Sequence, residues 1–291
     1  MGESGLVPCP HLGPCPGCRP LSPALSRQGR GCQDDPPVTS TPPSPDAAWR
    51  ELHARATEPY RQGGNFAWHF ARGKLGHDPV FRGIVERGLI GEGRPRMLDI
   101  GSGQSLLANV LHTGHAMRAE GRWPGAWAPL PADARYTGIE LMPRDVERAQ
   151  RSVGHIRPTP TIVCGNMCEA DFPACDVVVI LDVLHYVDHA AQEGVLLRVR
   201  DALTAGAAER DGVPGRLLLR VGDAASRRGF AISQWVDRTV TRIRGHKVSP
   251  TWGRTLDEWI GLLQRLDFAV QPMPMSQGTP FANVLLISDL P

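Results

Sequence analysis

Residues 96–103 read RMLDIGSG, a short apolar run with an acid that leads directly into two glycines. A strand that ends this way makes a sharp turn where the backbone can approach a ligand, because glycine adopts dihedral angles that other residues avoid. Glu140, Asn166 and Asp182 similarly stand at or just after other apolar runs. Together these residue types favour hydrogen bonds to a small polar ligand at the ends of several strands.

The elements that must position these residues alternate between strand-like and helical patterns after residue 95. Short apolar runs occupy 96–100, 135–141, 161–164, 176–183 and 216–221. This alternation predicts an α/β fold, a doubly wound and mostly parallel sheet covered on both faces. The last two runs, 268–275 and 281–290, are joined by a loop too short for a parallel crossover, so they predict an antiparallel pair. Ligands of such sheets bind at the carboxyl ends of the strands, where Asp99 and the three other polar residues fall.

Helix signals support this arrangement. Residues 46–95 predict an N-terminal helical segment, with Asp46 as the N-cap of its first helix and Asp78, followed by a proline, as the N-cap of a later one. Residues 188–206 predict a crossover helix that ends before Gly206. Thr255 and Glu258 have capping-box spacing at the start of a C-terminal helix.

These motifs, in this order, resemble the class I S-adenosylmethionine-dependent methyltransferases over residues 94–289. The resemblance implies a seven-stranded sheet with an antiparallel last strand and S-adenosyl-L-methionine as cofactor. It implies that Glu140 binds the ribose hydroxyls, that Asn166 accepts from the adenine amine, and that Met167 packs on the adenine. The cofactor-binding residues that it implies are Asp99, Gly101, Ser102, Gly103, Glu140, Leu141, Asn166, Met167 and Asp182.

Two features depart from the family pattern. The third small position of the glycine-rich loop is Ser105, which the start of a helix tolerates. The chain between Asp99 and Glu140 is longer than a strand-helix-strand unit needs, and residues 120–134 predict a surface insertion with two tryptophans.

Two segments are candidates for the acceptor pocket of this 46–291 methyltransferase domain. Residues 60–81 combine aromatic and basic side chains, although an ordinary amphipathic helix that docks on the sheet explains them equally well. Residues 222–254 predict a lid insertion with an apolar face and a cationic rim. These segments favour a small amphiphilic, acidic or carrier-bound acyl acceptor, which makes an acyl carrier protein a candidate partner. His185, just past the fourth strand, is the candidate catalytic base.

The first 45 residues hold 11 of the 27 prolines and no hydrophobic period, so they predict a disordered tail. Cys9, Cys15 and Cys18 in this tail resemble the iron-sulfur segment of RNA uracil-5-methyltransferases, with Cys32 as the nearest fourth ligand. That family also needs a nucleophilic cysteine after a later strand, and this sequence has none beyond Cys175. Zinc bound by the same thiols is a further alternative, but we interpret the cysteines as chance residues and expect no metal site.

Composition restricts the remaining alternatives. The 291 residues carry a formal net charge of +2, which gives no argument for a nucleic-acid partner, and the longest apolar run is too short to span a membrane. We therefore expect a cytoplasmic protein without a membrane span, and we disfavour nucleic acid as its partner. A nicotinamide enzyme is disfavoured because Leu106 stands where the third glycine of a dinucleotide fingerprint is required. A protein that binds S-adenosylmethionine without catalysis stays open as the alternative to an enzyme.

Overall fold

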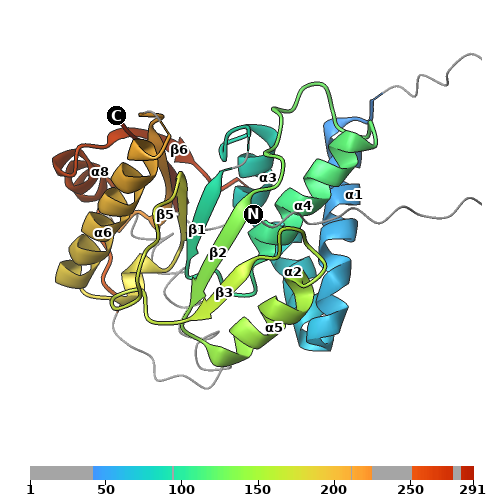
Figure 1. Ribbon diagram of the computed structural model, residues 1–291, viewed down its shortest axis with the longest axis horizontal. Coiled ribbons are helices and arrows are strands. Elements are labelled where there is room, and N and C mark those ends of the chain that lie inside the picture. Colours follow the sequence, from blue (N-terminus) through green and yellow to red (C-terminus); the bar gives the residue numbers. More distant parts are fainter. Residues whose placement is uncertain (1–41, 94, 211, 225–250, 278–282) are drawn as a thin grey trace, which may run out of the picture. The chain divides into compact units, whose positions relative to one another are not determined.

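The structure is a computed structural model that describes residues 42–93, 95–210, 212–224, 251–277 and 283–291. One seven-stranded sheet has the order β3-β2-β1-β4-β5-β7-β6 (Figure 1). Its strands are β1 (Arg96–Ile100), β2 (Arg135–Glu140), β3 (Thr161–Cys164), β4 (Val177–Leu181), β5 (Gly215–Gly222), β6 (Ala269–Pro274) and β7 (Asn283–Leu290). β1 to β5 pair in parallel, and β7 is antiparallel to both β5 and β6. The predicted fold class and the seven predicted strands are confirmed.

Helices cover both faces of the sheet (Figure 1). One face packs against α1 (Pro45–Thr57), η1 (Glu58–Gly63), α2 (Asn65–His77), α3 (Pro79–Glu86), α4 (Leu106–Ala119) and α5 (Pro143–Val153). The other packs against α6 (His189–Ala208) and α8 (Leu256–Arg265), and the short η2 (Leu184–Tyr186) follows β4. Alternation along the strands separates the two cores: in β1, Met97 belongs to the first core, whereas Leu98 and Ile100 belong to the second.

Local capping signals mark several of the helix starts. The Asp78 side chain accepts from the Val80 N–H at the start of α3, and Thr255 and Glu258 form a reciprocal capping box at α8, as predicted. The first helix is an exception, because Ser44 rather than Asp46 is its N-cap and Pro45 is its first residue. Proline is favoured at this position since its missing N–H would lack a helical partner anyway.

The prediction that α6 ends before Gly206 is wrong, because the helix continues to Ala208. Gly206 is required here by packing and not by helix termination. A Cβ atom added to Gly206 would lie 1.9 Å from the carbonyl oxygen of Cys175, so only glycine lets the helix backbone approach the chain that leads into β4.

The insertion at residues 120–134 is not merely a surface loop. Trp127 and Leu130 are buried in the first core, and the Trp123 ring packs edge to face on Trp127 at 5.0 Å between centroids. The Trp123 indole N–H donates to the carbonyl oxygen of Ala128 at 3.1 Å. This segment therefore extends the core over α4, and the expectation of a surface insertion is corrected to that extent.

Several predicted features lie outside the described residues. They are the four tail cysteines with nearly all of the proline-rich tail and most of the predicted lid, residues 225–250. Within the described ranges, no helix is long and apolar enough to cross a membrane. In those same ranges, no cluster of three His, Cys, Asp or Glu side chains could hold a metal ion.

Candidate active site

The carboxyl ends of β2, β1 and β4 meet at the point where the strand order reverses. β1 lies between β2 and β4, with Ile100 opposite both Ile139 and Ile180. The glycine-rich loop leaves β1 at this edge, and the Gly101 and Ser102 N–H groups donate to the carbonyl oxygen of Ile139 at 2.8 and 3.0 Å. The reversal point of an open α/β sheet is where such folds bind ligands.

Glu140, the last residue of β2, ties its strand end to this loop. One carboxylate oxygen accepts from the Gly103 N–H at 2.9 Å, and the other accepts from the Met142 N–H at 2.8 Å. A carboxylate oxygen can accept more than one hydrogen bond, so a group of this type suits the binding of ligand hydroxyls. The structure therefore brings together two predicted site residues that are far apart in the sequence.

The loop itself is a run of left-handed residues. Gly101, Gly103 and Ser105 have φ angles of 72°, 56° and 55°. Ser105 is thus a non-glycine residue in a conformation that glycine normally occupies, which is a stronger departure than the helix start that we predicted. Tyr60 explains how this conformation is held, because its hydroxyl donates to the carbonyl oxygens of Gln104 and Ser105, each at 3.0 Å.

Asp99 is the most deeply placed of the predicted site residues. Its side chain accepts a hydrogen bond from the Tyr136 hydroxyl, and the residue is 5% exposed. Burial raises the pKa of Asp99 to about 7; the Tyr136 hydrogen bond opposes this shift and the negative charge of Glu140 adds to it. Sequence reasoning missed Tyr60 and Tyr136, because nothing in their local sequence indicates a buried acid as a neighbour.

The raised pKa of Asp99 predicts a pH-dependent stability. Between about pH 4 and pH 7 the folded chain keeps a proton that the unfolded chain has released, so stability should fall as pH rises, by up to about 1.4 kcal/mol per pH unit. Asp99→Asn should lack this component. Urea unfolding of both proteins at pH 5 and pH 7 measures the difference, and an identical pH dependence would show that Asp99 is ionised throughout.

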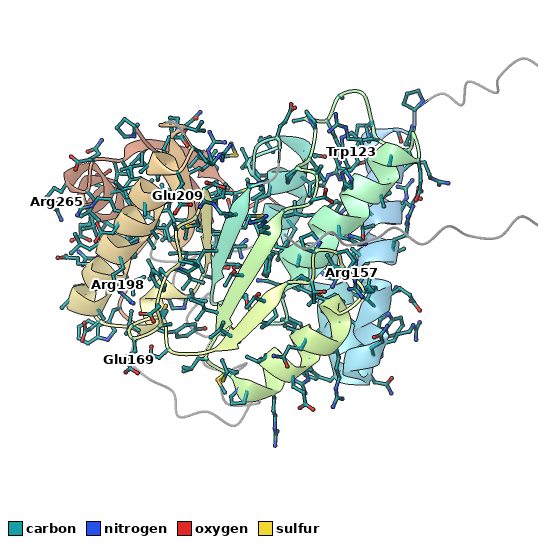
Figure 2. The ribbon with its side chains drawn as sticks, in the orientation of Figure 1. Trp123, Arg157, Glu169, Arg198, Glu209 and Arg265 are labelled. Atoms are coloured by element: carbon teal, nitrogen blue, oxygen red, sulfur yellow. The ribbon has the colours of Figure 1, made fainter. Side chains whose placement is uncertain are left out.

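The loop after β3 carries Asn166 and Met167. The Asn166 side chain caps its own turn, with its oxygen accepting from the Cys168 N–H at 3.0 Å and its amide donating to Glu169 at 3.2 Å. Arg198 of α6 donates to the Met167 and Ala170 carbonyl oxygens and so holds this loop to α6 (Figure 2 labels Arg198 and Glu169). Leu141, which follows Glu140, is 60% exposed.

Asp182, one residue beyond β4, is paired inside the protein. Arg220 of β5 donates to both of its carboxylate oxygens and to both oxygens of Asp78. Sequence reasoning did not connect these three residues. Arg220 stands inside the apolar run LLLRV, and a charge at such a position in a central strand is the signal that could have found it.

Gln192 of α6 holds the loop that carries His185 through hydrogen bonds to its backbone. This fully buried amide donates to the carbonyl oxygens of Leu184, Val187 and Trp252, at 3.2, 3.1 and 2.8 Å. The Trp252 N–H in turn donates to the carbonyl oxygen of His185 at 2.8 Å. The backbone at His185 therefore has a defined position at the carboxyl edge.

Residues 60–81 are largely explained by packing. α2 docks through Ala67, Ala71 and Leu75, and the guanidinium groups of Arg61 and Arg72 lie over the Trp68 ring, 3.9 and 4.9 Å from its centroid. These contacts favour the amphipathic-helix interpretation for most of the segment. The segment reaches the candidate site at Lys74, whose ammonium group lies 4.0 Å from Asp182.

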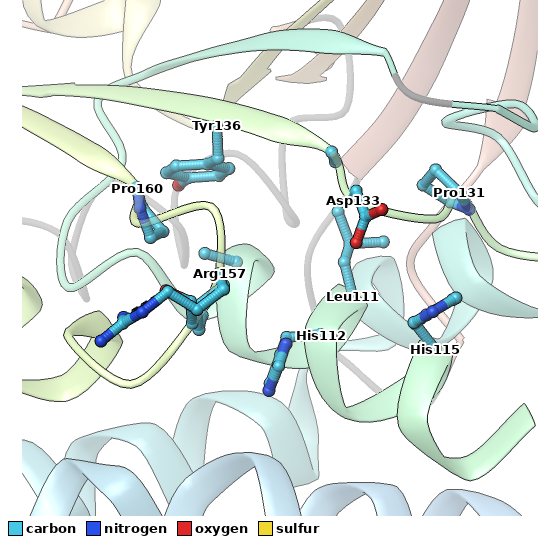
Figure 3. A pocket seen from close by; sticks show the side chains of 11 residues that line it. Leu111, His112, His115, Pro131, Asp133, Tyr136, Arg157 and Pro160 are labelled. Carbon is cyan, nitrogen blue, oxygen red and sulfur yellow. Dashed lines mark hydrogen bonds between the residues drawn. The ribbon is translucent and has the colours of Figure 1, made fainter. Parts of the chain in front are cut away.

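A separate pocket lies at the amino ends of β2 and β3, away from this edge (Figure 3). His112 and His115 of α4, Asp133, Tyr136, Arg157 and Pro160 are among its lining residues. The Arg157 guanidinium donates to the carbonyl oxygens of Gly154 and Ile156 and is thus turned onto its own loop. None of the predicted site residues lines this pocket.

One family model and several solved structures are similar to this chain. A family model described as a methyltransferase domain matches residues 98–208, the segment that contains the glycine-rich loop, Glu140 and His185. The comparison with curated protein sequences found no match.

Solved structures share the fold at low identity. An O-methyltransferase family protein from Burkholderia thailandensis is 16% identical, with a TM-score of 0.52 over 84% of this chain and 70% of that one. Magnesium protoporphyrin IX methyltransferase from Synechocystis PCC 6803 with bound S-adenosylmethionine is 12% identical, with a TM-score of 0.50 over 87% and 100%. An O-methyltransferase family 2 protein from Planctomyces limnophilus in complex with apigenin is 16% identical, with a TM-score of 0.51 over 86% and 63%. Residues 98–208 therefore match a methyltransferase domain, and the chain shares the fold of these solved methyltransferases.

Proposed function

We propose that this methyltransferase transfers the methyl group of S-adenosylmethionine to a small apolar or amphiphilic acceptor. The observation that carries the proposal is the Glu140 carboxylate, which lies at the end of β2 and is hydrogen-bonded to the glycine-rich loop. In this proposal Glu140 accepts from the two ribose hydroxyls, while Gly101, Ser102 and Gly103 line the methionine half of the cofactor.

The residues at this edge fit such a cofactor. A Cβ atom added to Gly103 would meet nothing within 4 Å, so open space adjoins the loop. In this proposal the exposed Leu141 supplies apolar surface for the adenosyl group, and Asn166 and Met167, which follow the neighbouring strand β3, bind the adenine. When bound, S-adenosylmethionine supplies an electrophilic methyl group, so the protein's own contribution is to orient the acceptor and exclude water.

Exposed aromatic side chains support an apolar acceptor. Tyr186 and Trp252 are 41% and 43% exposed and both belong to the segments that Gln192 fastens beside His185. Large apolar side chains gathered at a site edge are typical of a binding surface. Two described cations of this region are already paired, Arg254 with Glu193 at 2.9 Å and Lys74 with Asp78 at 2.7 Å. In this proposal an acidic or carrier-bound acyl acceptor would therefore depend on the basic residues in the sequence of segment 225–250.

We propose His185 as the general base for a hydroxyl acceptor, since histidine exchanges protons readily near neutral pH. His185→Asn should lower the methyl-transfer rate by roughly a hundredfold or more and leave cofactor affinity unchanged. The measurement is the pH dependence of the rate for both proteins. A near-normal rate profile would leave His185 with a structural role only.

Isothermal titration with S-adenosylmethionine and S-adenosylhomocysteine tests the cofactor. A tritiated-methyl screen on hydroxylated aromatics, fatty acids and acyl carrier protein derivatives then tests transfer, with hydroxyl acceptors first because two of the structural neighbours are named O-methyltransferases. Binding without transfer would favour the alternative of a catalytically inactive binding protein. Transfer to RNA, together with iron bound to the full chain, would favour the iron-sulfur alternative.

A further inference from the structure

Arg220 of β5 is a buried cation shared by two acids from distant parts of the chain. It is 3% exposed, and its guanidinium donates to Asp182 through Nε at 2.8 Å and to Asp78 through Nη2 at 2.7 Å, with a second hydrogen bond to each carboxylate. Paired bidentate geometry of this kind specifies the relative position of both partners.

The charges in this group balance. Arg220 alone would leave one negative charge over, and Lys74 supplies the second positive charge, 2.7 Å from Asp78 and 4.0 Å from Asp182. Burial opposes ionisation of Asp78, but the hydrogen bonds and charge of Arg220 and the charge of Lys74 outweigh it and hold the pKa of Asp78 well below its usual range. The four side chains therefore form one neutral, paired unit.

One end of this unit sets a strained turn at the candidate active site. Asp182 has a φ angle of 59°, a left-handed conformation that is uncommon for residues other than glycine, although aspartate adopts it more readily than most. Its N–H also donates to the Arg220 carbonyl oxygen at 3.3 Å. The next residue, Val183, lies against Gly101 of the glycine-rich loop, and His185 follows two residues later.

The other end belongs to the N-terminal helical segment. Asp78 separates α2 from α3, and its side chain caps α3. Arg220 thus connects the segment that precedes β1 with the turn that follows β4.

We propose that Arg220 is a positioning residue of this methyltransferase. By holding Asp182 to Asp78, it fixes the turn that places Val183 against the glycine-rich loop and His185 beside the proposed acceptor. This role deepens the function proposed above and rests on it. Arg220 acts through Asp182 and is not itself a catalytic residue.

The test uses Arg220→Lys and Asp78→Asn in the full chain. Lysine keeps the charge but cannot hold two carboxylates at once, and asparagine removes the charge of Asp78 while it still caps α3. Arg216→Lys is the matched control. Arg216 lies on β5 like Arg220, four residues closer to the amino end of that strand, and it forms a bidentate pair with Asp289 of β7. The readouts are S-adenosylhomocysteine affinity by calorimetry and the imidazole resonance of His185 in ligand-free protein, assigned by its loss in His185→Asn.

Both test variants should weaken S-adenosylhomocysteine binding by about fivefold or more and shift the His185 resonance. The control should change neither, because the bidentate pair that it disrupts does not hold the turn at Asp182. Folded test variants that match the wild type in both readouts would overturn the proposal. If the wild-type chain does not bind S-adenosylhomocysteine, the proposed function fails. The His185 resonance still decides the positioning role in that case.

Discussion

Replacing Gly101 by alanine should destabilise the fold by about 2 to 5 kcal/mol, the sum of a left-handed conformation and an overpacked contact. Gly101 has a φ angle of 72°, and an added Cβ would lie 2.5, 2.8 and 2.9 Å from three side-chain atoms of Val183. Val183 cannot easily move away, because a β-branched side chain is stiff and its backbone follows the held turn at Asp182. Gly101→Val should be worse still.

Gly103→Ala is the matched control for this prediction. Gly103 is also left-handed, with a φ angle of 56°, but an added Cβ there meets no atom within 4 Å. Gly103→Ala should therefore lose only the stability that the left-handed conformation costs an alanine, about 1 to 2 kcal/mol. Urea unfolding of the three proteins gives the comparison, and equal losses for the two alanine variants would mean that Val183 does not pack on the loop.

Removing the Glu140 carboxylate should have the second large effect. Glu140→Ala should weaken binding of S-adenosylhomocysteine by about 1 to 3 kcal/mol, or roughly 5- to 150-fold, because charge-assisted hydrogen bonds are lost. The structure adds a reason that the sequence did not contain: the same carboxylate accepts from the Gly103 N–H, so its loss also frees the loop.

Two further variants separate these contributions. Glu140→Gln keeps an acceptor oxygen for one N–H and should lose less affinity than alanine. Glu147→Ala removes an exposed acid of α5 that pairs only with Arg151 among the described contacts, and it should bind as the wild type does. Calorimetry measures all four proteins. Normal affinity in a folded Glu140→Ala variant would exclude Glu140 from the cofactor site.

The sequence alone determined the features whose causes are local. The strand positions follow from short apolar runs, the start of α3 from Asp78 with Pro79, and the start of α8 from the Thr255 and Glu258 capping box, and the structure has all of them. The glycine-rich loop and its place after β1 were also predictable, because glycines that follow a strand carry a backbone requirement in their own residue type.

Only the tertiary structure decided which partners meet. The predicted end of α6 was wrong, because Gly206 allows close contact with Cys175 and does not end the helix. The buried pair of Asp99 and Tyr136 left no signal in the local sequence. Arg220 joins Asp182, 38 residues away, to Asp78, 142 residues away. Capping and alternation act within a few residues, whereas the burial and pairing of a charge depend on which strands and helices become neighbours, and the folded sheet alone determines that.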